Sequence, residues 1–468
     1  MPNFLAYLAL IFWPLASLAF FALWPARVAL MVCLLGGEMF LPSMFSIDLP
    51  LIPPINKDLV ASLSALLGCI IFKPRALKQK SAGARYNWLF LLMVAGSLGT
   101  TLTNADSLQY GPVHLPGQTM HDFVSDAILL FLTWWIPFHL GRKLFCQSDD
   151  LRVLLQALVV GGLIYSVFIF IEIRMSPQFH MWIYGYHQST FAQTVRFGSY
   201  RPKVFMRHGL NVALFMLMTL MAAVALRRAR IKALHVGATG WAIYLAVVLV
   251  LCRSTGAITY ALIFLPLLLW APARLQGRLA AVVALIVFVY PLLRTWDWVP
   301  VDSVISFFKS AVGDERTESL EFRLHNEQKL LQHAVQRPWF GWGGYARSFV
   351  YDRYTGDPAS VVDGFWIAVL GATGIVGFVS IFALLLVPII RFGRVLRRLP
   401  GHKRFLGAGV LMMSVIYVVD LIPNAGVGPY LTMMLGCLAG LQPDPPAPLW
   451  EEPYADPREA RAGFEVVA

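Results

Sequence analysis

Long apolar runs recur along the whole chain, and short polar or basic segments separate them. Most runs have about 17–22 residues, near the length at which a helix spans ~30 Å of hydrocarbon. Continuous apolar character with few charges is the pattern of membrane-spanning helices. The pattern therefore predicts helical spans at 4–23, 27–41, 58–72, 87–103, 123–141, 153–172, 208–226, 237–252, 256–272, 279–294, 363–390, 405–422 and 428–441.

This pattern predicts an all-α polytopic membrane protein with about twelve to fourteen transmembrane helices. Of the 468 residues, 58% are hydrophobic and only 14% are charged, whereas a soluble domain needs more charge to cover its surface. The formal net charge of +12 does not indicate a nucleic-acid partner. Lys and Arg of membrane proteins collect in cytoplasmic loops, and the chain carries no nucleic-acid-binding signature.

Basic residues alternate between successive loops. Loops with no Lys or Arg, such as 104–121 and 423–428, alternate with basic loops at 73–85, 141–143, 227–232, 273–278 and 391–404. The basic loops are expected in the cytoplasm. Counting spans then places residues 174–207 and 295–362 on the outer side.

Two parts of the chain follow from this threading. We expect a transmembrane domain over residues 1–441. The Pro-rich, acidic segment 442–468 is expected to be a disordered cytoplasmic tail.

One outer segment is unusually basic. The stretch "RFGSYRPKVFMRHGLN" (196–211) holds Arg196, Arg201, Lys203 and Arg207 directly before an apolar run. Such a cluster opposes the usual charge bias of outer loops. We therefore expect an anionic partner there.

Ionisable residues also gather near the outer ends of the predicted spans, and the middle of almost every span lacks them. Interfacial charges can simply reach for water or pair with one another, as Glu172 and Arg174 could. Charges placed only for that reason would occur equally at both membrane interfaces, whereas these residues gather at the outer one. The residues are Glu38, Asp126, Glu172, Arg174, Arg253, Asp363 and Asp420.

The long outer segment has a helical pattern of its own. Residues 318–338 place Leu320, Leu324 and Leu331 on one face, and Pro338 ends the pattern. This predicts an amphipathic helix over the outer mouth of the bundle, followed by the glycine- and aromatic-rich stretch "WFGWGGYARSF" (339–349).

Three outer motifs carry a resemblance to a known family. They are "RHGLN" (207–211), "CRSTGA" (252–257), and the segment from Arg323 through "QRPWFGWG" that precedes "DGFWIAVLGATGIVG" (363–377). In this order the chain resembles the O-antigen ligase and polysaccharide polymerase superfamily of bacterial envelope glycosyltransferases. The resemblance covers roughly residues 170–380.

The resemblance implies a GT-C-like helical glycosyltransferase in the bacterial inner membrane, with its active site facing the periplasm. The donor would be a glycan on undecaprenyl diphosphate and the acceptor a second glycan, with no metal or other cofactor. Other envelope polysaccharide assembly proteins are further implied partners. The family's diphosphate-binding arginines would correspond to Arg207, Arg253 and Arg323. Asp363 stands where ligases of the family carry His, which is compatible with a polymerase rather than a ligase acting on lipid A core.

The residue types suit this chemistry. Guanidinium groups stay charged and bind two oxygens at once, so they can stabilise a diphosphate leaving group without a metal. Asp363 could take the acceptor's hydroxyl proton, with His208 as the reserve base. The outer segments contain no DxD pair and no HExxH cluster. The remaining candidate substrate-binding residues are Arg196, Arg201, Lys203, Arg174 and Glu172.

Two other functions stay open at this stage. A flippase or transporter for the same lipid-linked glycan would need inverted repeats and charge at the midplane of the bilayer, and neither is evident. A non-enzymatic subunit of an envelope assembly complex is the other alternative.

Overall fold

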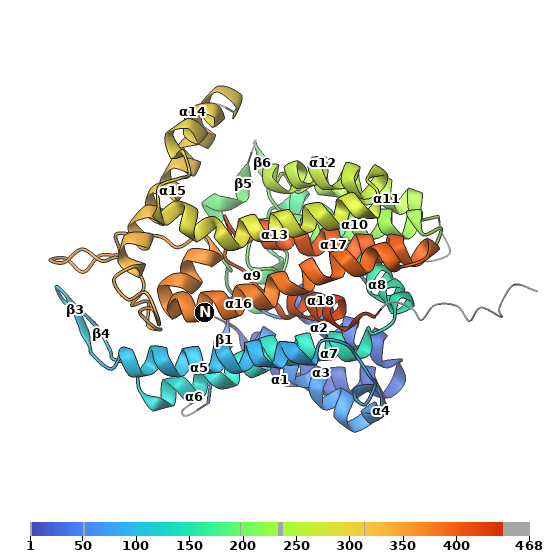
Figure 1. Ribbon diagram of the computed structural model, residues 1–468, viewed down its shortest axis with the longest axis horizontal. Helices are drawn as coiled ribbons and strands as arrows, with labels where there is room; N and C mark the ends of the chain where they lie inside the picture. Colours follow the sequence, from blue (N-terminus) through green and yellow to red (C-terminus); the bar gives the residue numbers. More distant parts are fainter. Residues whose placement is uncertain (1, 50–51, 197, 233–236, 313, 443–468) are drawn as a thin grey trace, which may run out of the picture.

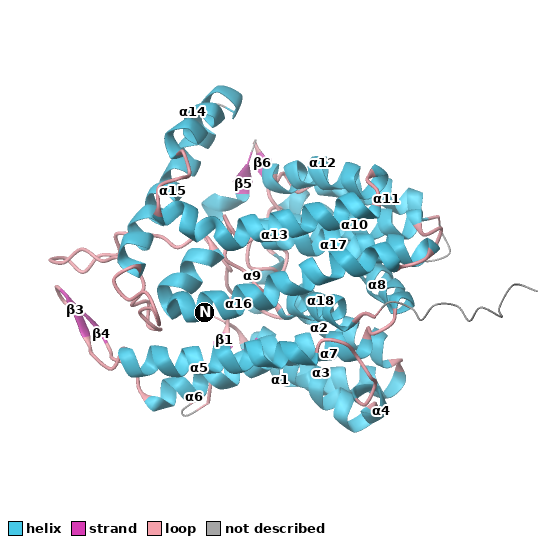
Figure 2. Ribbon diagram, viewed as in Figure 1, coloured by secondary structure: helices cyan, strands magenta, loops and turns pink. Residues whose placement is uncertain are grey.

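The computed structural model describes residues 2–49, 52–196, 198–232, 237–312 and 314–442. Nearly all regular structure is helical, and most long helices lie roughly parallel to one another (Figures 1 and 2). The tail expected beyond residue 442 lies outside the described residues.

The helices follow the predicted segments closely. In chain order they are α1 Phe4–Leu23, α2 Ala26–Phe40, α3 Lys57–Phe72, α4 Pro74–Leu77, α5 Asn87–Thr103, α6 Met120–Leu129, α7 Ile136–Leu144, α8 Leu151–Met175, α9 Phe179–Tyr184, α10 Gly209–Arg228, α11 Ala238–Leu251, α12 Thr255–Trp270, α13 Ala273–Thr295, α14 Val301–Val312, α15 Asp314–Ala334, α16 Phe365–Val395, α17 Gly401–Asp420 and α18 Pro429–Gly440. A π-helical turn, Leu130–Trp135, joins α6 to α7.

Strands are few and short. Within the described ranges, three antiparallel hairpins pair β1 Ser46–Ile47 with β2 Ile55–Asn56, β3 Leu108–Tyr110 with β4 Val113–Leu115, and β5 Val195–Arg196 with β6 Ser199–Tyr200. Short 3₁₀ turns occur at Ala84–Tyr86, Ser148–Asp150, Phe191–Thr194 and Leu396–Arg398.

The prediction of an all-α polytopic membrane protein is confirmed. Among the described residues, seven helices are long and apolar enough to cross a membrane: Phe4–Leu23, Met120–Leu144, Ser148–Met175, Gly209–Arg228, Ala273–Thr295, Phe365–Arg398 and Gly401–Asp420. The expected count of twelve to fourteen also included shorter helices, α2, α3, α5, α11, α12 and α18, which have 12 to 17 residues.

The centre of the bundle is α10. In an 18-residue apolar stretch of this helix, 89% of the residues are buried, whereas the share is 22% for α1 and 33% for α13. A helix that is apolar on all sides needs neighbours or lipid on all sides. Packing against α8, α11, α12 and α17 gives α10 those neighbours, whereas α1 and α13 keep wide apolar faces for lipid.

The two predicted sets of loops lie at opposite ends of the bundle. Contacts join the basic loops at one end: Lys143 Nζ donates to the Gln79 carbonyl at 2.9 Å, and Lys403 pairs with Asp149 at 3.0 Å. The other end carries α14, α15 and the β3–β4 hairpin, at the left of Figure 1. Segments 174–207, 295–362 and 423–428 meet at that end, as the cavity described below shows.

A break in α16 shapes this second end. Gly374 has a φ of +63° within the helix, and a Cβ there would lie 2.4 Å from the carbonyl carbon of Trp339. The loop 338–343 enters the break, where Ile375 N donates to the Pro338 carbonyl at 2.7 Å and three similar backbone bonds follow. The loop thereby satisfies backbone groups that the break leaves without helical partners.

Candidate functional site

A cavity of about 420 Å³, called the main cavity here, opens at the end of the bundle where the outer segments meet. Its walls come from the loop 188–190, the start of α10, α15, the residues before α16 and the loop after α17. The lining residues are Met44, Gln188, Ser189, Thr190, Arg207, His208, Leu210, Asn211, Leu214, Arg323, Val362, Asp363, Asp420, Asn424, Ala425 and Gly426.

Three of the four predicted catalytic residues line this cavity. Arg207 stands just before α10, Arg323 lies on α15, and Asp363 stands just before α16. Arg323 Nε lies 3.7 Å from Asp363 Oδ2, and the two side chains are 37% and 35% exposed. A long ion pair with this exposure leaves both groups accessible to a ligand.

An adjoining cavity of about 250 Å³ shares Leu210, Leu214, Arg323, Asp420 and Asn424 with the main cavity. It extends to Ser254, Gly256, Ala257 and Tyr260 of the α11–α12 turn and α12, and to Pro423. Arg323 and Asp420 therefore stand where the two cavities meet.

Arg253, the fourth predicted catalytic residue, adopts a left-handed φ of +51° in the α11–α12 turn. It directly precedes Ser254, which lines the adjoining cavity, but its own side chain is not among the lining residues of either cavity.

Asp420 is a site residue that the sequence analysis did not select. It ends α17, lines both cavities, and accepts a hydrogen bond from Asn424 Nδ2 at 2.9 Å. The available signal was its place among the carboxylates at the outer ends of the spans. That position alone did not distinguish it from its neighbours.

His208 also lines the main cavity and caps α10. Its Nδ1 accepts the backbone N–H of Leu210 at 3.2 Å. A ring whose Nδ1 is an acceptor carries its proton on Nε2 when neutral, so this arrangement presents a donor rather than a base.

Glu172 anchors the basic segment from behind the cavity. Its side chain is 1% exposed, and its carboxylate accepts the backbone N–H groups of Lys203 and Val204 at 2.8 Å each and of Phe179 at 3.2 Å. Two of these bonds hold the segment before Arg207 against the end of α8, and the third holds the start of α9 there.

Two other members of the basic cluster, Arg201 and Lys203, are not among the lining residues of the main cavity. Lys203 is 2% exposed and its Nζ donates to Ser189 Oγ at 3.1 Å, while burial lowers its pKa against the opposing effect of Glu172. Arg201 is 7% exposed and packs against Gly209. Arg174 is exposed at the end of α8, and the side chain of Arg196 lies outside the described structure.

A buried histidine fixes the same segment to the first helices. His180 accepts the Ser43 N–H at Nε2 (3.2 Å), and its Nδ1 lies 2.9 Å from the Tyr186 carbonyl. The ring is 1% exposed, and burial lowers its pKa to about 4. His180 is therefore neutral near pH 7, with Nδ1 as the donor to Tyr186.

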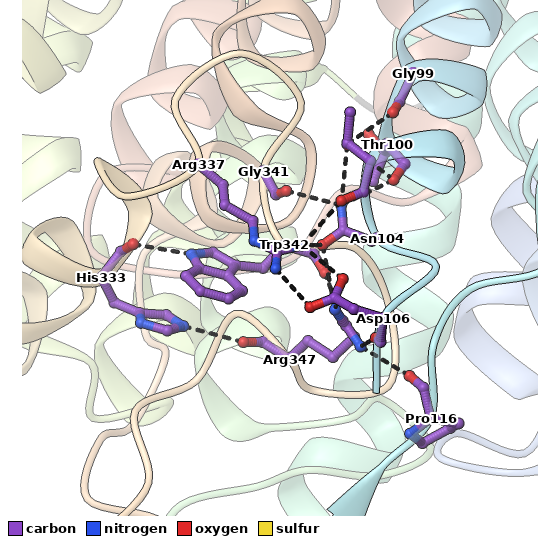
Figure 3. A network of polar contacts seen from close by, with 11 residues as sticks. Gly99, Thr100, Asn104, Asp106, Pro116, His333, Arg337, Gly341, Trp342 and Arg347 are labelled. Atoms are coloured by element: carbon purple, nitrogen blue, oxygen red, sulfur yellow. Dashed lines mark hydrogen bonds and ion pairs between the residues drawn. The ribbon is translucent and has the colours of Figure 1, made fainter. Parts of the chain in front are cut away.

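A second polar network joins the loop after α5 to the loop after α15 (Figure 3). Arg347 is fully buried and donates to the carbonyls of Asp106 (2.6 Å), Pro116 (3.0 Å) and Trp342 (3.0 Å). Arg337 pairs with the Asp106 carboxylate at 2.7 Å, and this hydrogen bond lowers the pKa of Asp106. The network holds the loop 338–343 in place beside the break in α16.

In the described part of the chain, no group of three or more His, Cys, Asp or Glu side chains is placed to hold a metal ion.

Comparison with known proteins bears on residues 240–382. No curated protein matches the chain. Residues 240–382 match the family model described as O-antigen ligase, a region that contains Arg253, Arg323 and Asp363. This match confirms the resemblance of the chain to the O-antigen ligase superfamily.

Proposed function

We propose that the protein is a polysaccharide polymerase of the bacterial inner membrane. It would transfer a glycan from an undecaprenyl-diphosphate-linked donor to a sugar hydroxyl of a second glycan at the periplasmic face. One observation carries this proposal: Arg207, Arg323 and Asp363, which stand far apart in the sequence, line one cavity at one end of a membrane bundle.

The reaction needs two kinds of group, and the cavity offers both. The acceptor oxygen bonds to C1 of the donor sugar as the bond from C1 to the phosphate oxygen breaks. Undecaprenyl diphosphate leaves with the bonding electron pair, and Arg207 and Arg323 stabilise its charge. The acceptor's hydroxyl proton passes to Asp363.

The remaining predicted residues have supporting roles in this proposal. Arg253, in the α11–α12 turn directly before Ser254 of the adjoining cavity, turns toward the diphosphate when the donor binds. Arg174 and Arg196 attract the anionic donor to the end of the bundle. Glu172, Arg201 and Lys203 act by holding the segment that presents Arg207, since all three are buried.

The acceptor and the metal requirement are part of the same proposal. Asp363 in place of the family's histidine favours a growing polysaccharide over lipid A core as the acceptor. Because guanidinium groups supply the positive charge, transfer should survive chelation of divalent cations.

Arginine variants test this function. Arg207→Ala, Arg253→Ala and Arg323→Ala should each abolish polymer in membranes while protein levels stay normal. Arg353→Ala, which removes an exposed arginine that lines neither cavity, is the matched control and should leave polymer unchanged. Normal polymer in all three variants would refute the proposal.

A further inference from the structure

A third cavity, called the Asp126 cavity here, borders α16 at Ala372 and Thr373. Its volume is about 270 Å³. The walls come from α5, α6, the π-helical turn, the loop after α15 and α16. The lining residues are Ser97, Thr100, Asp126, Leu129, Leu130, Thr133, Trp134, Gly343, Gly344, Ala372 and Thr373.

The polar groups of this cavity are mainly acceptors. Thr100, Thr133 and Thr373 donate their hydroxyl protons to the backbone carbonyls of Phe340, Leu129 and Val369 at 2.7 to 2.8 Å. Each hydroxyl oxygen keeps lone pairs that can accept. The lining residues described for this cavity include no Lys, Arg or His.

The Asp126 carboxylate is weakly bonded within the protein. Its Oδ2 accepts from Ser97 Oγ at 3.5 Å, the long limit of a hydrogen bond. A carboxylate can accept about four hydrogen bonds, so it has capacity for a ligand's donors. An occupant of this cavity must therefore be rich in donors.

Sugars fit these walls better than a single ammonium group does. A sugar carries several hydroxyl donors around its ring, which matches acceptors spread over α5, α6, the π-helical turn and α16. Its C–H faces suit Leu129, Leu130 and the indole of Trp134. An ammonium group presents all its donors at one point.

The two cavities are neighbours along α16. Trp134 of the Asp126 cavity stacks on Phe365, with ring centroids 6.1 Å apart, and Phe365 begins α16 two residues after Asp363. At 1.5 Å per helical residue, Phe365 and Ala372 lie roughly 10 Å apart along the axis, and Asp363 stands two residues before Phe365. One glycan of a few sugar residues can reach across that distance. Moreover, π-helical turns such as the one that carries Trp134 often occur at functional sites.

We propose that the Asp126 cavity binds one sugar residue of the glycan whose reacting end lies in the main cavity. This inference rests on the proposed transfer function, and it adds a second contact that fixes the position of the chain. Asp126 accepts the sugar's hydroxyl protons, and Trp134 with its apolar neighbours covers the ring.

Binding without turnover tests the proposal. The probe is the oligosaccharide that mild acid releases from the lipid-linked glycans of the cells that make this protein. Its affinity for the full-length protein in nanodiscs is measured by saturation-transfer NMR, with no donor lipid present. Asp126→Asn should weaken binding about ten-fold or more, the loss expected for a hydrogen bond to a charged group.

Two further variants keep this result interpretable. Ala372→Leu adds a larger side chain to the cavity wall without changing its charge and should also weaken binding. Two unrelated variants thus test the site, so a folding defect in one of them does not decide the result. Asp357→Asn, on an exposed turn that lines none of the three cavities, should bind as the wild type does. All variants are compared by melting temperature and elution volume.

Several outcomes would overturn the proposal. They are an absence of binding to the wild type, or unchanged binding in both Asp126→Asn and Ala372→Leu. In a third such outcome, the protein retains phosphatidylethanolamine only when Asp126 is present, whereas oligosaccharide binding does not depend on Asp126. That result would indicate a site for an ammonium group. If transfer fails in enzymatic assays but oligosaccharide binding still depends on Asp126, the proposed function falls and a glycan-binding site remains.

Discussion

The anchoring role of Glu172 gives a prediction with a magnitude that follows from the contacts. In Glu172→Gln the amide oxygen can still accept the N–H groups of Lys203 and Val204, but the NH₂ group then faces the N–H of Phe179. An orphaned buried N–H costs ~1–3 kcal/mol. The other two bonds lose the strength that a charged acceptor provides, about half of ~1.5–3 kcal/mol each.

The sum is ~2.5–6 kcal/mol. Because the variant no longer buries a charge, we expect a loss in the lower half of this range. A loss of ~3 kcal/mol raises the population of the locally opened segment about 150-fold. The segment before Arg207 should therefore open far more often, while the rest of the bundle stays folded.

Limited trypsin digestion measures this opening at one bond. Lys203 is 2% exposed in the folded protein. Trypsin does not cleave the bond between Arg201 and Pro202, because proline follows the arginine. Cleavage between Lys203 and Val204, followed by mass spectrometry, should accelerate by two orders of magnitude in Glu172→Gln. Glu321→Gln, at an exposed position on α15, is the matched control. Equal cleavage rates in the wild type and Glu172→Gln would refute the anchoring role.

Three other predictions concern the site and its supports. Arg323→Ala should lower the transfer rate about 100- to 1000-fold, the loss expected when one donor to a developing negative charge is removed. Arg323→Lys should restore part of this rate. Unchanged rates would exclude Arg323 from the reaction. Because its hydrogen bond with Arg337 lowers the pKa of Asp106, this carboxylate stabilises the loop junction above its ordinary pKa of about 3.9 and loses that effect as pH falls through the lower folded value. Hydrogen exchange of residues 337–347 should thus be flat from pH 7 to 5 after correction for intrinsic rates and accelerate below 4, and an equally flat profile below 4 would contradict this. Gly374→Ala should sharply reduce the melting temperature because the added Cβ would clash with the backbone of Trp339. Gly237→Ala should not, because the space that its Cβ would occupy is open. Equal melting temperatures of the two variants would contradict the role given to Gly374 in the break of α16.

The helical layout could be predicted from the sequence because apolar length is a strong local signal. Predicted spans 4–23 and 87–103 match α1 and α5 residue for residue. The break at Gly374 could not be predicted, since the run around it is continuously apolar. It depends on the loop 338–343, which is distant in sequence and supplies the backbone partners.

The candidate site was partly predictable for a similar reason. Arg207 and Arg323 lie in predicted outer segments and Asp363 directly follows one, so counting the spans placed all three on one side of the membrane. Sequence alone could not tell which charges of the basic cluster face the cavity. Lys203 faces inward because Glu172 holds its backbone, a contact between residues 31 positions apart.

Other parts of the fold left no clear trace in the sequence pattern. No pattern in the sequence predicted α14, and the amphipathic helix expected at 318–338 runs instead from Asp314 to Ala334 as α15. The final residues before Pro338 form turns instead, because the chain bends there to enter the break in α16.

The most direct test of the central claim is a reaction with purified components. The protein, reconstituted alone, is incubated with undecaprenyl diphosphate that carries a defined, labelled oligosaccharide. The account predicts longer lipid-linked glycan together with free undecaprenyl diphosphate, in the presence of a chelator. Recovery of the donor unchanged, or its movement across the membrane without a new glycosidic bond, would contradict the account.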